Sequence, residues 1–271
     1  MKFTAVEGNR QHLDGGAMFG NVPKEMWKKW ITPDEKNRIP LACRSLLVQT
    51  EDKNILFDVG IGSFFEPKLK ERFGIFEEEL MLLKNLESLG LSEEDIDAIV
   101  LSHLHFDHCG GLFPSYGETP RLLFPKAKIY LGKDHFEHAK NPPLRERASF
   151  VPEMIRMLGE SPRLHLVNGE EHKDFKGLVK FSYSHGHTVG LMLSTIQNTT
   201  FVTDLIPGIP WVHLPVVMGY DRFPELTVIE KQSFLEKAVV AKTRLFFTHD
   251  PEEPWAQVNR DAKGRFNASS I

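Results

Sequence analysis

The sequence predicts an α+β fold built from two β-sheets that carry helices on their outer faces. Segments of strand length alternate with segments that have apolar residues at helical spacing, and they form two sets, one before residue 160 and one after it. No low-complexity linker separates the sets. A chain of 271 residues, with 41% apolar and 26% charged residues, can bury a sizeable core. We therefore expect one domain over residues 1–271, with its two sheets packed face to face.

The expected strands are short apolar runs, most of them bounded by turn signals. They lie at residues 1–6, 41–49, 54–57, 96–101, 127–131, 163–167, 178–183, 191–196, 200–203 and 244–247, with a final hairpin at 256–266. Apolar residues at helical spacing predict helices at residues 75–89, 133–140, 152–158 and 226–240, the last of them amphipathic. Gly90 is placed to end the first helix, and Ser92 to Asp95 resembles a capping box.

Two segments carry no regular pattern. Residues 12–40 are expected to be irregular, but they are too apolar and aromatic for a linker, so we expect them to lie over the body of the protein. Residues 207–224 are expected to form a long loop that also brings aromatic and methionine side chains.

Composition excludes several classes of function. The net charge of −4 and the absence of any basic run argue against nucleic acid as a partner. Cys43 and Cys109 are the only cysteines, too few for a disulfide framework. The N-terminal residues lack the apolar core of a signal peptide, and no apolar run approaches the roughly 20 residues of a membrane span. We expect a cytoplasmic protein with no membrane partner, and the sequence leaves monomer and homodimer open.

The stretch Leu101-Ser-His-Leu-His-Phe-Asp-His-Cys-Gly-Gly111 places three imidazoles and a carboxylate where a buried strand ends. A single histidine is more often a satisfied polar group, but this density indicates metal binding, because neutral imidazole and carboxylate are ligands for zinc and its neighbours. The pattern alone does not distinguish one metal from two. The candidate ligands in it are His103, His105, Asp107 and His108.

Three later residues, His187, Asp204 and His249, also follow apolar runs of strand length. Together the seven suffice for two metals. One ion would take His103, His105 and His187, and the other would take Asp107, His108 and His249. Asp204 would bridge the two ions, because a carboxylate has two oxygens to share.

These motifs resemble the metallo-beta-lactamase fold hydrolases over nearly the whole chain. The resemblance rests on Phe-Asp58-Val-Gly, on His-Leu-His-Phe-Asp-His, on Gly-His187-Thr, and on Asp204 and His249. It implies a four-layer αββα sandwich with a dinuclear site. It also favours His187 over the nearby His185 as the ligand. Within the family, the chain looks most similar to the quorum-quenching N-acyl homoserine lactone lactonases, through the stretches 14–20, 37–40 and 217–221.

The resemblance implies a metal-dependent hydrolase that acts on ester bonds. Two divalent ions would produce a bridging hydroxide that attacks a lactone carbonyl, with Asp107 passing the proton and Asp204 setting the metal spacing. Zinc is the expected metal, and manganese, iron and cobalt are the alternatives. Some lactonases have a substrate-binding tyrosine three positions after the bridging aspartate; this chain has Pro207 there, and Tyr220 is the candidate replacement.

Several further residues have two interpretations. Asp58 either caps a turn or supports a metal ligand. Cys109 is expected to be a small buried residue. An apolar substrate pocket or core packing would equally explain a set of side chains near the site: Phe19, Phe64, Phe65, Trp211, His213, Met218, Tyr220 and Phe223.

The same ligands would also serve a phosphotriesterase or arylesterase, or a thioester hydrolase. A protein of another class, a scaffold that binds metal for structure only, is the non-enzymatic alternative. It is disfavoured because a structural site is normally closed by four ligands around one ion.

Overall fold

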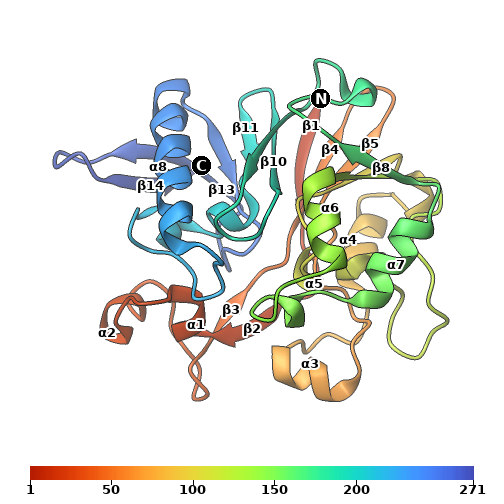
Figure 1. Ribbon diagram of the computed structural model, residues 1–271, viewed down its shortest axis with the longest axis horizontal. Coiled ribbons are helices and arrows are strands. Elements are labelled where there is room, and N and C mark those ends of the chain that lie inside the picture. Colours follow the sequence, from red (N-terminus) through yellow and green to blue (C-terminus); the bar gives the residue numbers. More distant parts are fainter. The chain divides into compact units, whose positions relative to one another are not determined.

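Two units make up the computed structural model, which describes residues 1–271 (Figure 1). The first unit contains residues 1–11 and 42–168, and the second contains residues 12–41 and 169–271. Each unit is built on a six-stranded sheet, and helices accompany both sheets. The expected mixture of helices and sheets is therefore confirmed.

The sheet of the first unit has the strand order β1-β4-β5-β6-β7-β8. Its strands are β1 (Lys2–Val6), β4 (Ser45–Gln49), β5 (Asn54–Phe57), β6 (Ala98–Leu101), β7 (Lys128–Gly132) and β8 (Leu164–Val167). The strands from β5 to β8 pair in parallel. Because parallel strands end at the same edge of a sheet, the segments that follow β5 and β6 begin side by side. This places Asp58 next to the start of the histidine-rich motif.

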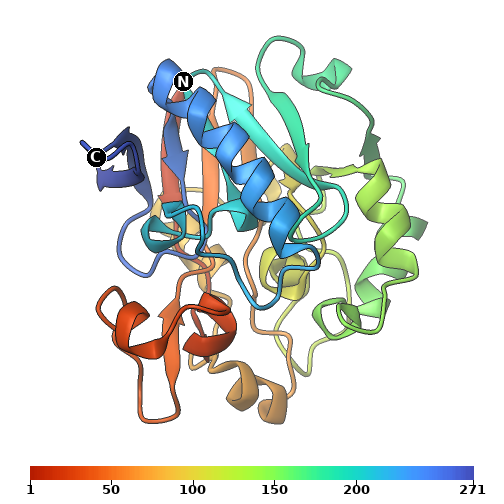
Figure 2. The same ribbon diagram turned by 60° about the vertical axis from the view of Figure 1, so that its left-hand side comes forward.

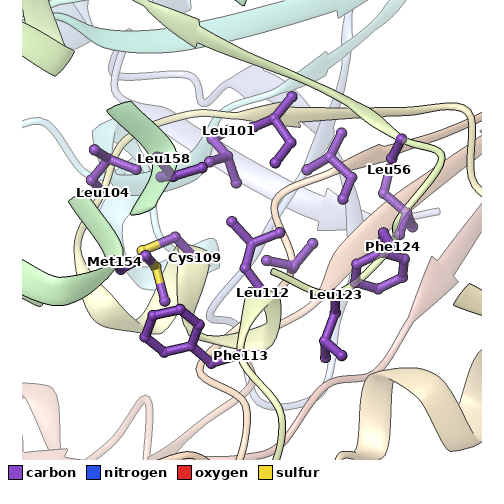
Figure 3. Packing of buried hydrophobic residues seen from close by; sticks show 14 of the residues in the cluster. Leu56, Leu101, Leu104, Cys109, Leu112, Phe113, Leu123, Phe124, Met154 and Leu158 are labelled. Atoms are coloured by element: carbon purple, nitrogen blue, oxygen red, sulfur yellow. The ribbon is translucent and has the colours of Figure 1, made fainter. Parts of the chain in front are cut away.

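Helices and 3₁₀ turns complete the first unit, with bounds α3 (Pro67–Phe73), α4 (Met81–Ser88), η1 (Glu93–Asp95), α5 (Phe106–Cys109), η2 (Gly110–Leu112), α6 (Lys133–Lys140), η3 (Arg147–Ser149) and α7 (Pro152–Glu160). The core lies between the sheet and these helices. Figure 3 shows Leu56 and Leu101 of the strands in one apolar cluster with Met154 and Leu158 of α7. Cys109 belongs to the same cluster, as expected for a small buried residue.

The sheet of the second unit has the strand order β14-β13-β12-β11-β10-β9. Its strands are β9 (Lys180–Ser184), β10 (Leu191–Ile196), β11 (Thr199–Phe201), β12 (Arg244–Phe246), β13 (Trp255–Arg260) and β14 (Phe266–Ser270). The strands β11 and β12 are parallel, so the segments that carry Asp204 and His249 leave the sheet at the same edge.

The remaining elements of the second unit include its longest helix, α8, which packs against β13 (Figure 2). Their bounds are α1 (Gly15–Phe19), α2 (Lys24–Trp27), β3 (Arg38–Leu41), η4 (Lys173–Phe175), η5 (Thr203–Leu205), η6 (Ile209–Val212) and α8 (Pro224–Ala241). The strand β2 (Gln11–Asp14) begins in the first unit, continues in the second and pairs with β3.

Most of the expected elements are present. The helix at residues 133–140 has the predicted bounds, Ser92 forms a capping box with Asp95, and the C-terminal hairpin forms around Asp261. Four expectations were wrong. Residues 12–40 contain two short helices and two strand segments, and the strand expected at 41–49 begins only at Ser45.

The other two wrong expectations concern helices. The helix expected at 75–89 begins only at Met81, while an unpredicted helix, α3, is ended by Gly74 in the left-handed conformation. The helix α8 is not amphipathic in the usual sense, because it buries Lys231 and exposes Ile229 and Val240. Lys231 is buried where three backbone carbonyls accept hydrogen bonds from its ammonium group. No helix is both long enough and apolar enough to cross a membrane.

Candidate metal-binding site

The candidate ligands of the first unit lie on the segment that follows β6. His103 and His105 come before α5, and their potential ligand atoms lie within 4.8 Å of each other. Asp107 and His108 are in α5 and are equally close to each other. A Cβ added at Gly111 would lie 2.0 Å from the Val59 carbonyl oxygen, so only glycine permits this backbone approach. The motif is thus seated directly on the turn that follows β5.

Asp58 occupies that turn and supports His108. Its side chain is fully buried and accepts a hydrogen bond from His108 Nδ1 at 2.8 Å. It also accepts bonds from the amide and the hydroxyl of Ser102, at 2.6 and 2.7 Å. Between the two interpretations of Asp58, these contacts favour support of a ligand. An imidazole that donates through Nδ1 to a carboxylate carries its lone pair on Nε2, the atom that then faces a metal.

The other ligand candidates of this unit are held in the same manner. His105 Nε2 lies 3.0 Å from Glu146 Oε1, and His103 Nδ1 lies 2.9 Å from Ser102 Oγ. Asp107 Oδ2 accepts a bond from Gln11 Nε2 at 2.6 Å, which leaves Oδ1 on the side of His108 Nε2, 3.8 Å away. Each group is therefore oriented by a neighbouring protein side chain.

In the second unit, Asp204 lies between two histidines. Its Oδ2 is 3.1 Å from His187 Nε2, and its Oδ1 is 3.3 Å from His249 Nε2. Each carboxylate oxygen thus shares its surroundings with a different imidazole. Thr203, directly before it, has φ of 42°, an uncommon conformation for a β-branched residue that costs energy and is typical of functional sites. The Pro207 carbonyl accepts a bond from the His249 amide at 3.1 Å.

His187 is clamped between two carboxylates. Its Nδ1 lies 2.8 Å from Asp221 Oδ1, while its Nε2 faces Asp204. Burial by itself lowers the pKa of His187, but Asp204 and Asp221 outweigh it and raise the pKa to about 10. The two carboxylates thus favour the doubly protonated ring, and a cation bound to Nε2 would take the place of the Nε2 proton.

His185 has a different environment. Its Nδ1 accepts a hydrogen bond from the Gly190 amide at 3.1 Å, and its own amide donates to Glu230 at 3.0 Å. These contacts indicate that His185 stabilises the turn in which it lies. The loop of residues 184–186 is held by the Glu230 carboxylate, which also accepts from Ser184 Oγ at 2.6 Å and from the Gly186 amide at 3.1 Å.

The aromatic and methionine side chains singled out for a pocket divide by burial. Phe19, Trp211 and Met218 are 0 to 4% exposed and belong to the core of the second unit, where Phe19 stacks on Trp211 at 4.6 Å. This favours packing over a pocket wall for these three. Tyr220 and Phe223 are 42% and 44% exposed.

The remaining pocket candidates are partly or fully buried. In the first unit, Phe65 packs on Phe106 of the motif at 5.3 Å, and Phe64 is half-buried beside it. In the second unit, the His213 ring stacks on Trp30, and burial lowers the pKa of His213, helped by Arg265 and Lys231. A place for any of these side chains in a substrate pocket stays a prediction.

Three residues that hold candidate ligands, and one that holds the loop before His187, were not identified from the sequence: Gln11, Glu146 and Asp221, and Glu230. Asp221 lies within one of the stretches that carry the lactonase-level resemblance, which was a usable signal. The other three are polar residues in ordinary polar surroundings along the chain. Their partners are 41 to 96 residues away, so no local pattern marks them.

The donor set in both units fits a transition metal. It consists of imidazole nitrogens and carboxylate oxygens, the ligands of zinc, manganese, iron and cobalt sites, and no thiolate takes part. Burial raises the pKa of the Cys109 thiol well above its ordinary value, which keeps it protonated and unsuited to binding metal. Each unit thus carries its own group of ligand candidates.

Known proteins of similar sequence and structure include hydrolases and lactonases. An N-acyl homoserine lactonase of a Bacillus species is 33% identical over 239 residues, covering 82% of this chain and 86% of the relative. A probable metal-dependent hydrolase from Staphylococcus aureus has a TM-score of 0.87 and 26% identity, with 100% of this chain and 96% of that chain covered. AidC, a dizinc quorum-quenching lactonase, has a TM-score of 0.78 at 23% identity, covering 99% of this chain and 94% of its own, a likeness of fold alone.

The sequence also matches a family directly. Residues 38–249 match the metallo-beta-lactamase superfamily, and this range includes every candidate ligand, from His103 to His249. The fold expected from the motifs, with β-sheets flanked by helices, agrees with this match and with the solved structures. The chain therefore belongs to the metallo-beta-lactamase superfamily and is a metallo-hydrolase of that group.

Proposed function

We propose that this protein is a dinuclear metal-dependent lactonase that opens the ring of N-acyl homoserine lactones. The observation that carries the proposal is the environment of Asp204, whose two oxygens face His187 and His249 separately, at 3.1 and 3.3 Å. A carboxylate that serves a single metal has no need of a histidine on each oxygen. This arrangement suits a carboxylate that bridges two ions.

The proposed ligands are the seven candidates of the two units. One ion would be held by His103, His105 and His187, the other by Asp107, His108 and His249, with Asp204 common to both. Zinc is the proposed metal, with manganese, iron and cobalt as alternatives for nitrogen and oxygen ligands. When bound, the ions would supply a water acidified toward neutral pH and positive charge for the oxygen that becomes negative.

The chain's own residues would orient the reaction and move its proton. Gln11 donates to Oδ2 of Asp107, so Oδ1 would be the oxygen that faces the ions, and Asp107 is the proposed proton carrier. It would receive a proton from the attacking water and deliver it to the ring oxygen when the C–O bond breaks, so the proton is conserved. No serine or cysteine nucleophile is required.

The lactonase subclass is supported by how three stretches of the second unit contact one another. Asn37 Nδ2 donates to Asp14 Oδ2 at 2.8 Å, and the Gly219 amide donates to the Ala17 carbonyl at 2.8 Å. These contacts join the segments 14–20, 37–40 and 217–221, which are the stretches that resemble lactonases. Asp221 at the end of the last segment holds His187, so this cluster is connected to a proposed ligand.

The substrate is proposed to be a lactone with an apolar tail. Among the aromatic side chains singled out for a pocket, Tyr220 and Phe223 are the exposed ones, and Tyr220 is the proposed replacement for the tyrosine missing at Pro207. Each methylene of an acyl chain that becomes buried would contribute about 0.8 kcal/mol, which is about fourfold in kcat/KM until the pocket is full.

A hydrolysis panel tests the proposal. The protein is assayed with homoserine lactones of rising acyl length, an aryl ester, a phosphotriester, a β-lactam and a glutathione thioester, and its metal content is measured. We expect two ions per chain and the highest kcat/KM for lactones, rising with chain length. A phosphotriester or thioester that leads by tenfold or more would remove the lactonase assignment and leave a hydrolase. A single ion with no hydrolysis of any ester would instead favour a metal-binding scaffold.

A further inference from the structure

Glu146 is a buried carboxylate in a loop that otherwise faces solvent. Its exposed fraction is 4%, whereas Leu144 two positions earlier is 83% exposed, and Arg145 and Arg147 beside it are both exposed. Glutamate is almost never this buried unless it is paired. The side chain therefore pays a desolvation cost that a surface loop would not require, and its partners explain why it is held inside.

Those partners are two imidazoles on one carboxylate. Glu146 Oε1 lies 3.0 Å from His105 Nε2, and Glu146 Oε2 lies 2.7 Å from His138 Nε2, on α6. The loop is tied locally by bonds from the Glu146 amide to the Pro143 carbonyl and from the Ser149 amide to the Glu146 carbonyl. Phe150, four residues on, places its ring edge against His105 at 5.0 Å. The segment 146–150 thus contacts His105 twice.

Glu146 contacts a different ring nitrogen from the one that Asp58 and Asp221 contact in their histidines. His108 and His187 meet their carboxylates, Asp58 and Asp221, through Nδ1. His105 meets Glu146 through Nε2. A neutral imidazole carries one proton, and a carboxylate acceptor draws that proton to the nitrogen it faces. Glu146 therefore selects the opposite tautomer for His105, with the lone pair on Nδ1.

We propose that Glu146 is a positioning residue for the metal centre: it holds the His105 ring by accepting its Nε2 proton, and His138 fixes Glu146 by binding its second oxygen. The proposal rests on the metal centre proposed above. Nothing in the HxHxDH pattern points to Glu146, which lies 41 residues away in the sequence. In this view the α6–α7 loop, although remote in sequence from every ligand, sets the geometry of one of the two ions.

Three variants test the role: Glu146→Ala, Glu146→Gln and, as a matched control, Glu137→Ala. Glu137 is an exposed glutamate of α6, paired with Lys140 at the surface. We expect Glu146→Ala to weaken binding of one of the two zinc ions by 10- to 100-fold, the effect typical of groups that support a ligand. Glu146→Gln should retain most of the affinity, because its amide oxygen still accepts from His105 Nε2 while its NH₂ group faces His138. Glu137→Ala should bind zinc like the wild type.

Two measurements separate positioning from a merely structural role. Competition with a chromogenic chelator gives the affinity of each zinc ion, and ¹⁵N NMR of the metal-free protein reports the tautomer of the His105 ring. The expected spectrum has the proton on Nε2 in wild type and in Glu146→Gln, and a mixture of tautomers in Glu146→Ala.

Equal zinc affinity in all variants, or a wild-type His105 with its proton on Nδ1, would overturn the proposal. Equal loss at both ions, in a Glu146→Ala protein with a lowered unfolding temperature, would also overturn it in favour of a general structural role. If Glu146→Ala does not fold, the zinc affinity of Glu146→Gln and the tautomer of His105 in the wild type still test the proposal. None of these measurements uses hydrolysis, so an inactive protein that binds zinc would refute the lactonase proposal and leave this one intact.

Discussion

At the scale of residues, buried carboxylates contact one nitrogen of each imidazole ring and leave the other nitrogen for a second partner. Asp58 and Asp221 engage Nδ1 of His108 and His187, and each carboxylate is buried with an exposed fraction of 0 to 1%. Supporting groups of this kind raise the basicity of a ligand and hold its ring in place. They also make the site costly to alter, because a buried donor that loses its acceptor keeps its desolvation penalty.

His187 and His185 provide a matched pair for testing the proposed ligand set. His187→Ala removes an imidazole whose Nε2 faces Asp204, and we expect it to lose one of two metal ions. Its kcat/KM should fall by more than about 100-fold, beyond the effect of groups that only support ligands. His185→Ala removes only a turn contact to the Gly190 amide, so the metal content should stay at two and activity should change by less than about fivefold. Metal analysis of both purified variants gives the answer, and the reverse pattern would exchange their roles.

Substitutions of Asp58 test how much its buried hydrogen bonds contribute to stability. Asp58→Ala leaves His108 Nδ1 and two Ser102 donors without their buried acceptor, at a cost of about 3–5 kcal/mol in the free energy of unfolding. Asp58→Asn keeps an acceptor oxygen and tolerates the φ of 52° found here, so it should cost clearly less. Urea denaturation of the metal-free proteins measures both. Asp52→Asn, in the exposed turn between β4 and β5, is the control, and an Asp58→Ala protein as stable as that control would show that the buried network is dispensable.

At the scale of elements, α8 holds two loops of the second unit through adjacent residues of opposite charge. Glu230 accepts from the amides of the 184–186 loop, which leads to His187. Lys231 donates to the carbonyls of Trp211, His213 and Val216, at 3.0, 3.1 and 2.6 Å. An ammonium has three protons for three acceptors, which explains why a helix keeps a charged residue on its buried face.

Lys231 should give this unit a pH-dependent stability. Burial lowers its pKa from the ordinary 10.5 to about 7, although Asp221 acts in the opposite direction. Between pH 7 and 10.5 the unfolded chain then holds a proton that the folded chain has released, so the contribution of Lys231 to stability rises with pH across this window. The full change corresponds to about 5 kcal/mol, and it is absent below pH 7, where both states are protonated.

Urea midpoints at pH 6.5, 8.0 and 9.5 measure this effect in wild type and Lys231→Met. The wild type should gain stability relative to the variant as the pH rises, because methionine cannot titrate. Lys237→Met, on an exposed position of the same helix, should run parallel to wild type. Parallel curves for Lys231→Met as well would mean that the three carbonyls keep the pKa of Lys231 at its ordinary value.

At the scale of the whole molecule, metal binding is expected to contribute to stability because the proposed ligands of each unit lie on segments that only folding brings together. A ligand that binds only the native state stabilises it by about 4 kcal/mol at a thousandfold excess over Kd. For a chain of this size we expect chelation to lower the unfolding temperature by about 10 °C, and zinc to restore it. Calorimetry before and after dialysis against a chelator measures the shift. An unchanged unfolding temperature would indicate that the ions are absent or bind weakly.

The sequence by itself determined what depends on neighbours along the chain. Most of the strands, the helix at 133–140 and the capping box at Ser92 are local patterns, and the structure confirms them. The cluster of histidines after β6 is also a local pattern, and its role in binding metal stays a prediction. The candidate ligands at the ends of later strands were also visible, because a polar residue after an apolar run stands out. The family followed from the order of these motifs.

Only the tertiary structure decided which polar groups hold those ligands and which aromatic side chains are core. Phe19, Trp211, Tyr220 and Phe223 are all aromatic residues in irregular segments of the sequence. In the structure, Phe19 and Trp211 are buried, whereas Tyr220 and Phe223 are exposed. Glu146 and Lys231 are charged residues that any local rule places in solvent, and both are buried against partners outside their own segment, such as His105 and Val216, 41 and 15 residues away. The physical reason is that a buried charge is tolerated only where distant donors or acceptors compensate for its lost hydration, and local sequence carries no record of where those partners will be.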